Sequence, residues 1–231
     1  YREGQKKLVA DVYRTILRGK NLFIEAPTGV GKTISTIFPA VKAVGEGLAD
    51  RIFYLTAKTI TATVAKETFA LLEEQGYRAK VIQITAKEKL CLCEAMDCNP
   101  VNCPYAKGHF DRVNDAVFDL LQKSNLFTRE EVLAQAKEYQ VCPFEMSLDV
   151  ATWADNIVCD YNYVFDPNVY LKRFFQEGIK GDYLFLVDEA HNLVDRSREM
   201  YSADLYKEDV LAVKRIMKAH SRTICRILDK C

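Results

Sequence analysis

The chain has 231 residues, and its 32 Lys and Arg balance 32 Asp and Glu, so its formal charge at pH 7 is zero. Hydrophobic residues make up 49% and charged residues 28%, a composition that excludes a disordered, collagen-like or low-complexity protein. The zero net charge also argues against a histone-like or tail-driven polyanion binder. The length is sufficient for a substantial core, in one large domain or in one domain with an insertion.

Short apolar, β-branched and aromatic runs alternate with longer helical patterns along much of the chain. Five runs are expected to form buried strands, at residues 21–25, 51–55, 80–84, 156–160 and 183–187. Helices are expected at residues 32–45 and 59–74, where apolar residues recur with helical spacing. This alternation is typical of βαβ units, so the sequence predicts an α/β fold around a parallel sheet.

The alternation breaks after about residue 86, where four of the eight cysteines fall within residues 91–103. Helical stretches follow at 112–123 and 128–139, and an amphipathic helix is expected near the end, at about 207–219. We therefore expect four parts. Residues 1–85 and 146–200 form the sheet domain, 86–145 form an insertion, and 201–231 begin a second, helical insertion.

The sequence also limits where the protein acts. It has neither a secretory signal pattern nor a run that approaches the ~20 apolar residues of a membrane helix. We expect an intracellular protein, cytoplasmic if bacterial, with no membrane partner. In that reducing compartment clustered cysteines bind metal more often than they form disulfides.

A phosphate-binding pattern follows the first expected strand. It consists of Ala26, Pro27, Thr28, Gly29, Val30, Gly31, Lys32 and Thr33. Small residues let the backbone approach a phosphate, the lysine reaches the terminal phosphates, and the hydroxyl binds Mg²⁺. Alanine replaces the first glycine of the usual pattern, and an ordinary glycine-rich turn is the alternative. The position between a strand and a helix favours a P-loop.

An Asp-Glu-Ala-His sequence, residues 188–191, directly follows the last expected strand. A carboxylate at the end of a buried parallel strand beside a P-loop can hold Mg²⁺, and the next carboxylate can orient the attacking water. An incidental acidic turn is the alternative for the tetrapeptide alone. Together with the P-loop it predicts nucleoside triphosphate hydrolysis.

Motifs spread over residues 2–191 resemble the DinG/XPD family of superfamily 2 iron-sulphur DNA helicases. The resemblance rests on Arg2-Glu3-Gly4-Gln5, the P-loop with Ala26 at its first position, Thr56-Ala57-Lys58-Thr59, the inserted cysteines, Cys142-Pro143-Phe144, residues 159–167 and the Asp-Glu-Ala-His sequence. It implies a RecA-like P-loop sheet with helices on both faces. A small, cysteine-rich, mainly helical iron-sulphur insertion would interrupt this sheet.

The resemblance also assigns roles in ATP hydrolysis. Lys32 would bind phosphate, Thr33 and Asp188 would hold Mg²⁺, and Glu189 would activate water. His191 would couple the nucleotide site to a second RecA-like domain of the same full-length chain.

Further residues are candidates for ligand contacts. Gln5 would read the adenine edge, unless it is simply solvated near a chain end. Lys58 and Thr59 follow the second expected strand and can contact DNA phosphates, although a helix start with a solvated lysine is the alternative. Tyr161 and Tyr163 alternate after the fourth expected strand and can stack on bases, with core packing as the alternative.

Four cysteines match the family's pattern for a 4Fe-4S cluster, namely Cys91, Cys98, Cys103 and Cys142. Cys93 is an extra thiol that can replace Cys91, and zinc is the competing metal because four thiolates also suit a tetrahedral site. Other residues are given structural roles: Cys159 is expected in the core, and His109 on the surface rather than as a ligand.

These expectations describe the first motor domain of an ATP-dependent DNA helicase of DNA repair type. By resemblance it translocates 5' to 3' on single-stranded DNA and unwinds forked DNA, with the cluster subdomain as the strand-separating element. The isolated chain is expected to be inactive, because motors of this kind complete their site with an arginine from a neighbouring domain. The alternatives are an ATP-dependent clamp or damage sensor without unwinding, and a zinc-stabilised, non-enzymatic DNA-binding module.

Overall fold

The computed structural model describes residues 4–27, 29–57 and 59–230, with only the backbone described for Thr59 and Ile60. The chain forms two compact units, which meet in sequence between Asn192 and Leu193. The second unit contains α10 (Leu193–Met200), α11 (Lys207–Met217) and α12 (Arg222–Leu228). All other helices and strands described below belong to the first unit.

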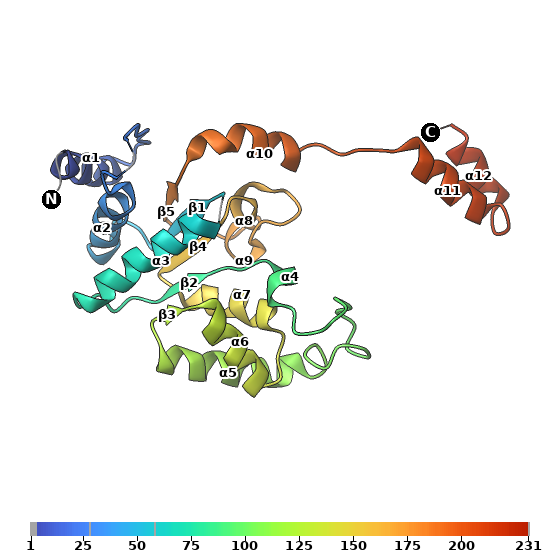
Figure 1. Ribbon diagram of the computed structural model, residues 1–231, viewed down its shortest axis with the longest axis horizontal. Helices are drawn as coiled ribbons and strands as arrows, with labels where there is room; N and C mark the ends of the chain where they lie inside the picture. The colour runs from blue at the N-terminus through green and yellow to red at the C-terminus, as the bar shows by residue number, and fades with distance from the viewer. Residues whose placement is uncertain (1–3, 28, 58, 231) are drawn as a thin grey trace. The chain divides into compact units, whose positions relative to one another are not determined.

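A parallel sheet forms the centre of the first unit (Figure 1). Its strands are β1 (Arg51–Thr56), β2 (Val81–Gln83), β3 (Leu126–Phe127), β4 (Asn156–Asp160) and β5 (Tyr183–Val187). They lie in the order β3-β2-β4-β1-β5, and every neighbouring pair is parallel. Four of the five expected strands are therefore present close to their expected bounds, because apolar runs suit strands that are covered on both faces.

The strand expected at residues 21–25 is absent, so that prediction is wrong. These residues are not in a strand of the described structure, and Leu22, Phe23 and Ile24 are exposed, Phe23 at 93%. A strand needs a neighbour that pairs with its backbone groups, and an apolar sequence alone does not supply one. Within the described residues, β5 pairs only with β1, so the sheet ends there.

Helices cover both faces of the sheet. On one face, α2 (Lys32–Gly45) and α3 (Thr59–Glu74) contribute Ile37 and Phe69 to a core that also holds Tyr54 and Val158 of the strands. α1 (Gln5–Leu17) packs against α2.

The other face of the sheet is packed with aromatic side chains. The ring of Phe53 in β1 lies 5.3 Å from that of Phe174 in α9 (Lys172–Phe175) and 5.6 Å from that of Phe185 in β5. Together the two covered faces confirm the predicted α/β fold with helices on both sides of a parallel sheet.

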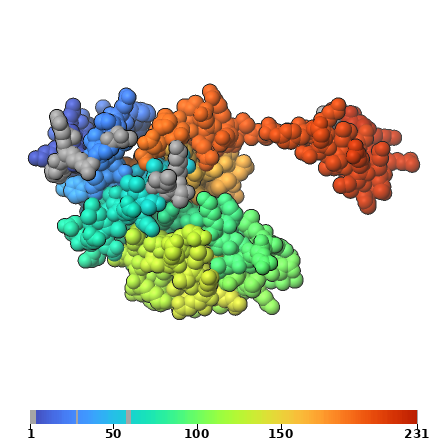
Figure 2. Space-filling view, in the orientation of Figure 1, coloured from blue at the N-terminus to red at the C-terminus, as the bar shows by residue number. Residues whose placement is uncertain are grey.

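The stretch of residues 86–145, which contains the clustered cysteines, is mainly helical, and its later helices lie beside β3 (Figure 1). Figure 2 shows this stretch, coloured green to yellow-green, in the lower part of the view. Its helices are α4 (Lys87–Leu90), α5 (His109–Lys123), α6 (Arg129–Glu138) and α7 (Pro143–Trp153). A capping box starts α6, with the Thr128 hydroxyl accepting from the Glu131 N–H. The sequence did not predict β3, whose two residues pair with β2 and join the stretch to the sheet.

Two short elements complete the first unit, α8 (Asn162–Phe165) after β4 and a 3₁₀ turn (Ala190–Asn192) after β5. In the described part of the chain, every helix is too short or too polar to cross a lipid bilayer.

Candidate functional site

Three neighbouring strands end side by side at one edge of the sheet. Thr56 at the end of β1 is in register with Asp160 at the end of β4. The N–H of Asp188, just beyond β5, donates to the carbonyl of Leu55 at 2.9 Å. In open parallel sheets, ligands bind outside this carboxyl edge.

The P-loop residues have backbone conformations that suit a phosphate. Gly29 and Gly31 have φ of 83° and 79°, a region that favours glycine. A Cβ at Gly31 would also lie 2.5 Å from Nε2 of Gln5. Gly31 precedes α2 and offers no side-chain cap, so the first amides of the helix remain available to an anion. Lys32 Nζ donates to the carbonyl of Ala26 at 2.9 Å, across the loop.

Most of the other residues predicted to form the P-loop are described by the structure. Pro27 and Val30 lie in the loop, Thr33 is in the first turn of α2, and Thr28 lies outside the described residues. The described residues of the pattern thus form a loop that leads directly into α2.

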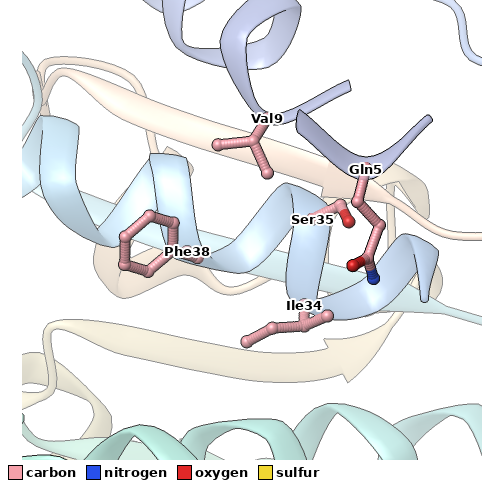
Figure 3. Close-up of a pocket in the computed structure, with 5 residues that line it drawn as sticks. All are labelled: Gln5, Val9, Ile34, Ser35 and Phe38. Atoms are coloured by element: carbon pink, nitrogen blue, oxygen red, sulfur yellow. The ribbon is translucent and has the colours of Figure 1, made fainter. Parts of the chain in front are cut away.

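Gln5 contacts the P-loop directly, because its Nε2 donates to the carbonyl of Val30 at 2.9 Å. It also lines a cavity of about 210 Å³ between α1 and α2, together with Val9, Ile34, Ser35 and Phe38. Figure 3 shows the Gln5 amide reaching from α1 towards the start of α2. The cavity is smaller than the roughly 300–1,000 Å³ of drug-sized ligand sites, so it suits one ring system rather than a whole nucleotide.

A buried tyrosine links the P-loop to the acidic pair. Burial raises the pKa of Tyr54, which is 2% exposed, and the nearby Asp188 carboxylate and Thr33 hydroxyl shift that pKa in opposite directions. Burial raises the pKa of Asp188, and Tyr54 acts on it in the opposite direction. The sequence does not predict a role for Tyr54, since nothing in an apolar strand marks one residue as a neighbour of two distant motifs.

Glu189 and His191 of the Asp-Glu-Ala-His sequence are exposed side chains. Glu189 Oε2 lies 3.5 Å from His191 Nδ1, and the two side chains are 43% and 73% exposed. The imidazole of His191 is therefore accessible from solvent.

Both tyrosines that were predicted to stack on DNA are in the core. Tyr161 is 0% and Tyr163 7% exposed. A buried ring has no free face for a base, so the core alternative is correct in this structure. Of the other DNA candidates, Lys58 lies outside the described residues, and Thr59 begins α3 with its side chain undescribed.

Five thiols line one cavity of about 20 Å³, namely those of Cys91, Cys93, Cys98, Cys103 and Cys142. Cys93 Sγ and Cys103 Sγ are 3.8 Å apart, and burial together with the neighbouring thiols raises the pKa of Cys93 to about 11. Within the described ranges, no three His, Cys, Asp or Glu side chains meet closely enough to hold a metal ion. The structure thus gathers the four predicted ligands and their rival without forming a closed metal site.

A lysine and a histidine lie beside these thiols. Lys87 lies close to Cys98 and Cys142, and these two thiols raise the pKa of the lysine, Cys98 the more strongly. His109 was predicted to be a surface residue, but it is only 4% exposed. Burial lowers the pKa of His109, and its Nδ1 accepts from the backbone N–H of Cys142 at 3.2 Å. Cys159 is buried in β4, as expected for a core residue.

We predict that His109→Phe lowers the free energy of unfolding by about 1–3 kcal/mol, because the Cys142 N–H loses its buried acceptor. Chemical denaturation of the 231-residue chain measures the change. His191→Phe is the control, since that histidine is 73% exposed. Equal stability of the two variants would show that the Cys142 N–H does not depend on His109.

The family models match most of the chain. The DEAD_2 model matches residues 74–210, and the DEAD/DEAH box helicase model matches residues 3–102. Two solved structures share the fold over the whole chain. One, titled XPD_Helicase, has a TM-score of 0.65 at 19% identity, with 39% of that structure covered. The other, titled Truncated XPD, has a TM-score of 0.61 at 18% identity, with 63% covered.

Two of the curated relatives that the chain resembles are named as helicases. The chain is 24% identical, over 87% of its length, to the general transcription and DNA repair factor IIH helicase subunit XPD/RAD3 of Saccharomyces cerevisiae. It is 22% identical, over 89% of its length, to human regulator of telomere elongation helicase 1. The chain spans 30% of the yeast protein and 21% of the human one. Because one family model alone covers more than half of it, the chain belongs to the DEAD_2 family, among the XPD/DinG-like superfamily 2 helicases.

Proposed function

We propose that the chain is the ATP-binding first motor domain of an ATP-dependent DNA helicase. The observation that carries this proposal is that Thr33 of the P-loop and Asp188 after β5 both lie near enough to the Tyr54 hydroxyl to shift its pKa. The two side chains come from distant parts of the sequence. They are the hydroxyl and the carboxylate that Mg²⁺ needs beside a nucleotide.

Each residue of this site has a role in hydrolysis. The amides of the 26–33 loop and Lys32 bind the phosphates, and Thr33 and Asp188 hold Mg²⁺. Glu189 orients the attacking water and accepts its proton. Gln5 holds the loop through Val30 and faces the cavity between α1 and α2, where it reads the adenine edge.

The rest of the motor lies in a second RecA-like domain of the full-length chain. ATP binds between the two domains, and His191 transmits closure from Glu189 to the second one. Cycles of closure move single-stranded DNA through the motor, 5' to 3', and forked DNA is unwound. Lys58 and Thr59, which follow β1, contact the phosphates of the strand.

We propose residues 1–85 and 146–200 as the motor domain, 86–145 as an iron-sulphur subdomain, and 201–231 as the start of a helical, arch-like insertion. Cys91, Cys98, Cys103 and Cys142 would hold a 4Fe-4S cluster. Four thiols on one cavity are the donor chemistry that such a cluster requires. A cavity of about 20 Å³ has room for about one water, so the loop of residues 91–103 must open around the group.

The cluster would act as a structural cross-link that makes the subdomain rigid enough to separate DNA strands. Lys87, beside Cys98 and Cys142, would offset the negative charge of the thiolates. Zinc is the second candidate, because tetrahedral Zn–S bonds of about 2.3 Å place two sulphurs about 3.8 Å apart. The Cys93 and Cys103 sulphurs have this separation, 3.8 Å.

We predict that the full-length protein hydrolyses ATP faster when single-stranded DNA is added and that it displaces a strand from a fork with a 5' tail. A fork with only a 3' tail tests the direction. The isolated 231-residue chain, the control, is expected to neither hydrolyse ATP at a useful rate nor unwind, because motors of this kind complete their site with an arginine from a neighbouring domain. DNA-stimulated hydrolysis without displacement on either fork would instead support a clamp or damage sensor.

A further inference from the structure

Glu189 has a backbone conformation that its residue type disfavours. Its φ is 51°, in the left-handed region, where a residue with a Cβ is uncommon. A non-glycine residue keeps such a conformation only where its surroundings hold it, and these residues gather at functional sites. The question is which contacts hold Glu189.

Three donors converge on its carbonyl oxygen. The N–H and the Nδ2 of Asn192 donate to it at 3.0 Å and 2.9 Å, within the 3₁₀ turn. The Tyr161 hydroxyl donates to it at 3.1 Å and also to the carbonyl of Asp188. The single proton of Tyr161 is therefore shared between the two carbonyls of the acidic pair.

The hydrogen bond from Tyr161 differs from those of Asn192 because Tyr161 lies in another segment of the chain. It directly follows β4, and β1 lies between β4 and β5. Its buried side chain thus ties the residues after β5 to the end of a strand that β5 does not touch. Since Asn192 is in the same turn as Glu189, it cannot fix that turn relative to the sheet.

We infer that Tyr161 is a positioning residue of the ATPase site, whose hydroxyl holds the backbone of Asp188 and Glu189 so that their carboxylates face Mg²⁺ and the attacking water. The inference rests on the proposed function. Tyr161 itself touches neither nucleotide nor water, because its side chain is 0% exposed. Loss of the Tyr161 hydroxyl therefore changes the orientation of the Asp188 and Glu189 carboxylates but leaves both side chains in place.

The test is Tyr161→Phe in the full-length protein, which keeps the ring and removes only the hydroxyl. We expect kcat for ATP to fall about five- to tenfold, the equivalent of one lost hydrogen bond, with KM changed less than about twofold. Tyr163→Phe is the matched control, since Tyr163 is a buried tyrosine in the same segment, 7% exposed. An unchanged kcat in Tyr161→Phe, or an equal fall in Tyr163→Phe, would overturn the inference.

Two further measurements separate the causes of a loss. A fluorescent ADP analogue with Mg²⁺ should bind Tyr161→Phe within about twofold of the wild-type affinity, because the P-loop is intact. Lost binding would mean that the hydroxyl only supports the fold, and the inference would fail. Lys32→Ala tests the proposed function separately: if it retains turnover, the site itself is wrongly assigned, whatever Tyr161→Phe does.

Discussion

Lys32→Ala is expected to abolish ATP turnover by the full-length protein. Lys32 is the one positively charged side chain among residues 26–33, so it alone would supply a positive charge to the terminal phosphates. In this structure its Nζ donates to the carbonyl of Ala26, across the loop. Loss of one preorganised donor to a developing charge costs about 10²–10³-fold in rate. Steady-state hydrolysis at saturating ATP and Mg²⁺ measures the effect, together with the midpoint of thermal unfolding.

The fold should survive this change, because one partly exposed hydrogen bond is worth about 0.5–1.5 kcal/mol. The control is Lys42→Ala on the same helix, whose Nζ pairs with Glu46 at 2.8 Å on the surface. Lys42→Ala should keep full turnover. Retained turnover in Lys32→Ala, at wild-type ATP affinity, would mean that residues 26–33 do not hold the phosphates.

Cys142→Ser is expected to remove the brown colour and the iron and sulphide of protein purified without oxygen. Cys142 stands apart from the other cysteines in sequence and starts α7, so it joins the loop of residues 91–103 to a helix of the subdomain. With one of four thiolates lost, we expect cluster retention to fall by about tenfold or more. Visible absorption with iron, sulphide and zinc analysis measures the result.

The same experiment distinguishes between the neighbouring thiols. We expect Cys91→Ser to lose the colour and Cys93→Ser to keep it, and the reverse would exchange the two as ligands. Cys225→Ser, in the second unit, is the control. A colourless wild-type protein with stoichiometric zinc would replace the iron-sulphur proposal by the zinc alternative.

Much of the fold follows from local patterns in the sequence. Residues 32–45 and 59–74 are helices with the expected bounds, and residues 156–160 and 183–187 are strands with the expected bounds. The helices have apolar residues at helical spacing, and the strands are runs of five residues rich in β-branched or aromatic side chains, so the local sequence is sufficient. The P-loop and the Asp-Glu-Ala-His sequence were equally visible, since each needs specific residues at neighbouring positions.

Contacts between distant residues were not visible in this way. Apolar residues 21–25 have the composition of a strand, yet they lie outside the sheet because no described strand pairs with them. His109 and Tyr161 are polar enough for the surface, but each is buried where its polar atom meets a backbone group, of Cys142 and of Asp188 and Glu189 respectively. Only the packing of the chain offers such partners.

The sequence by itself thus determined the kind of protein, a P-loop sheet domain with a cysteine-rich insertion. The tertiary structure decided which side chains lie behind the proposed sites: Tyr54 near Thr33 and Asp188, Tyr161 behind the acidic pair, and His109 behind Cys142. The physical reason is that residue types and their spacing encode local conformation and chemistry. The burial of a hydroxyl or an imidazole, in contrast, is stable only where a partner far away in the sequence satisfies it.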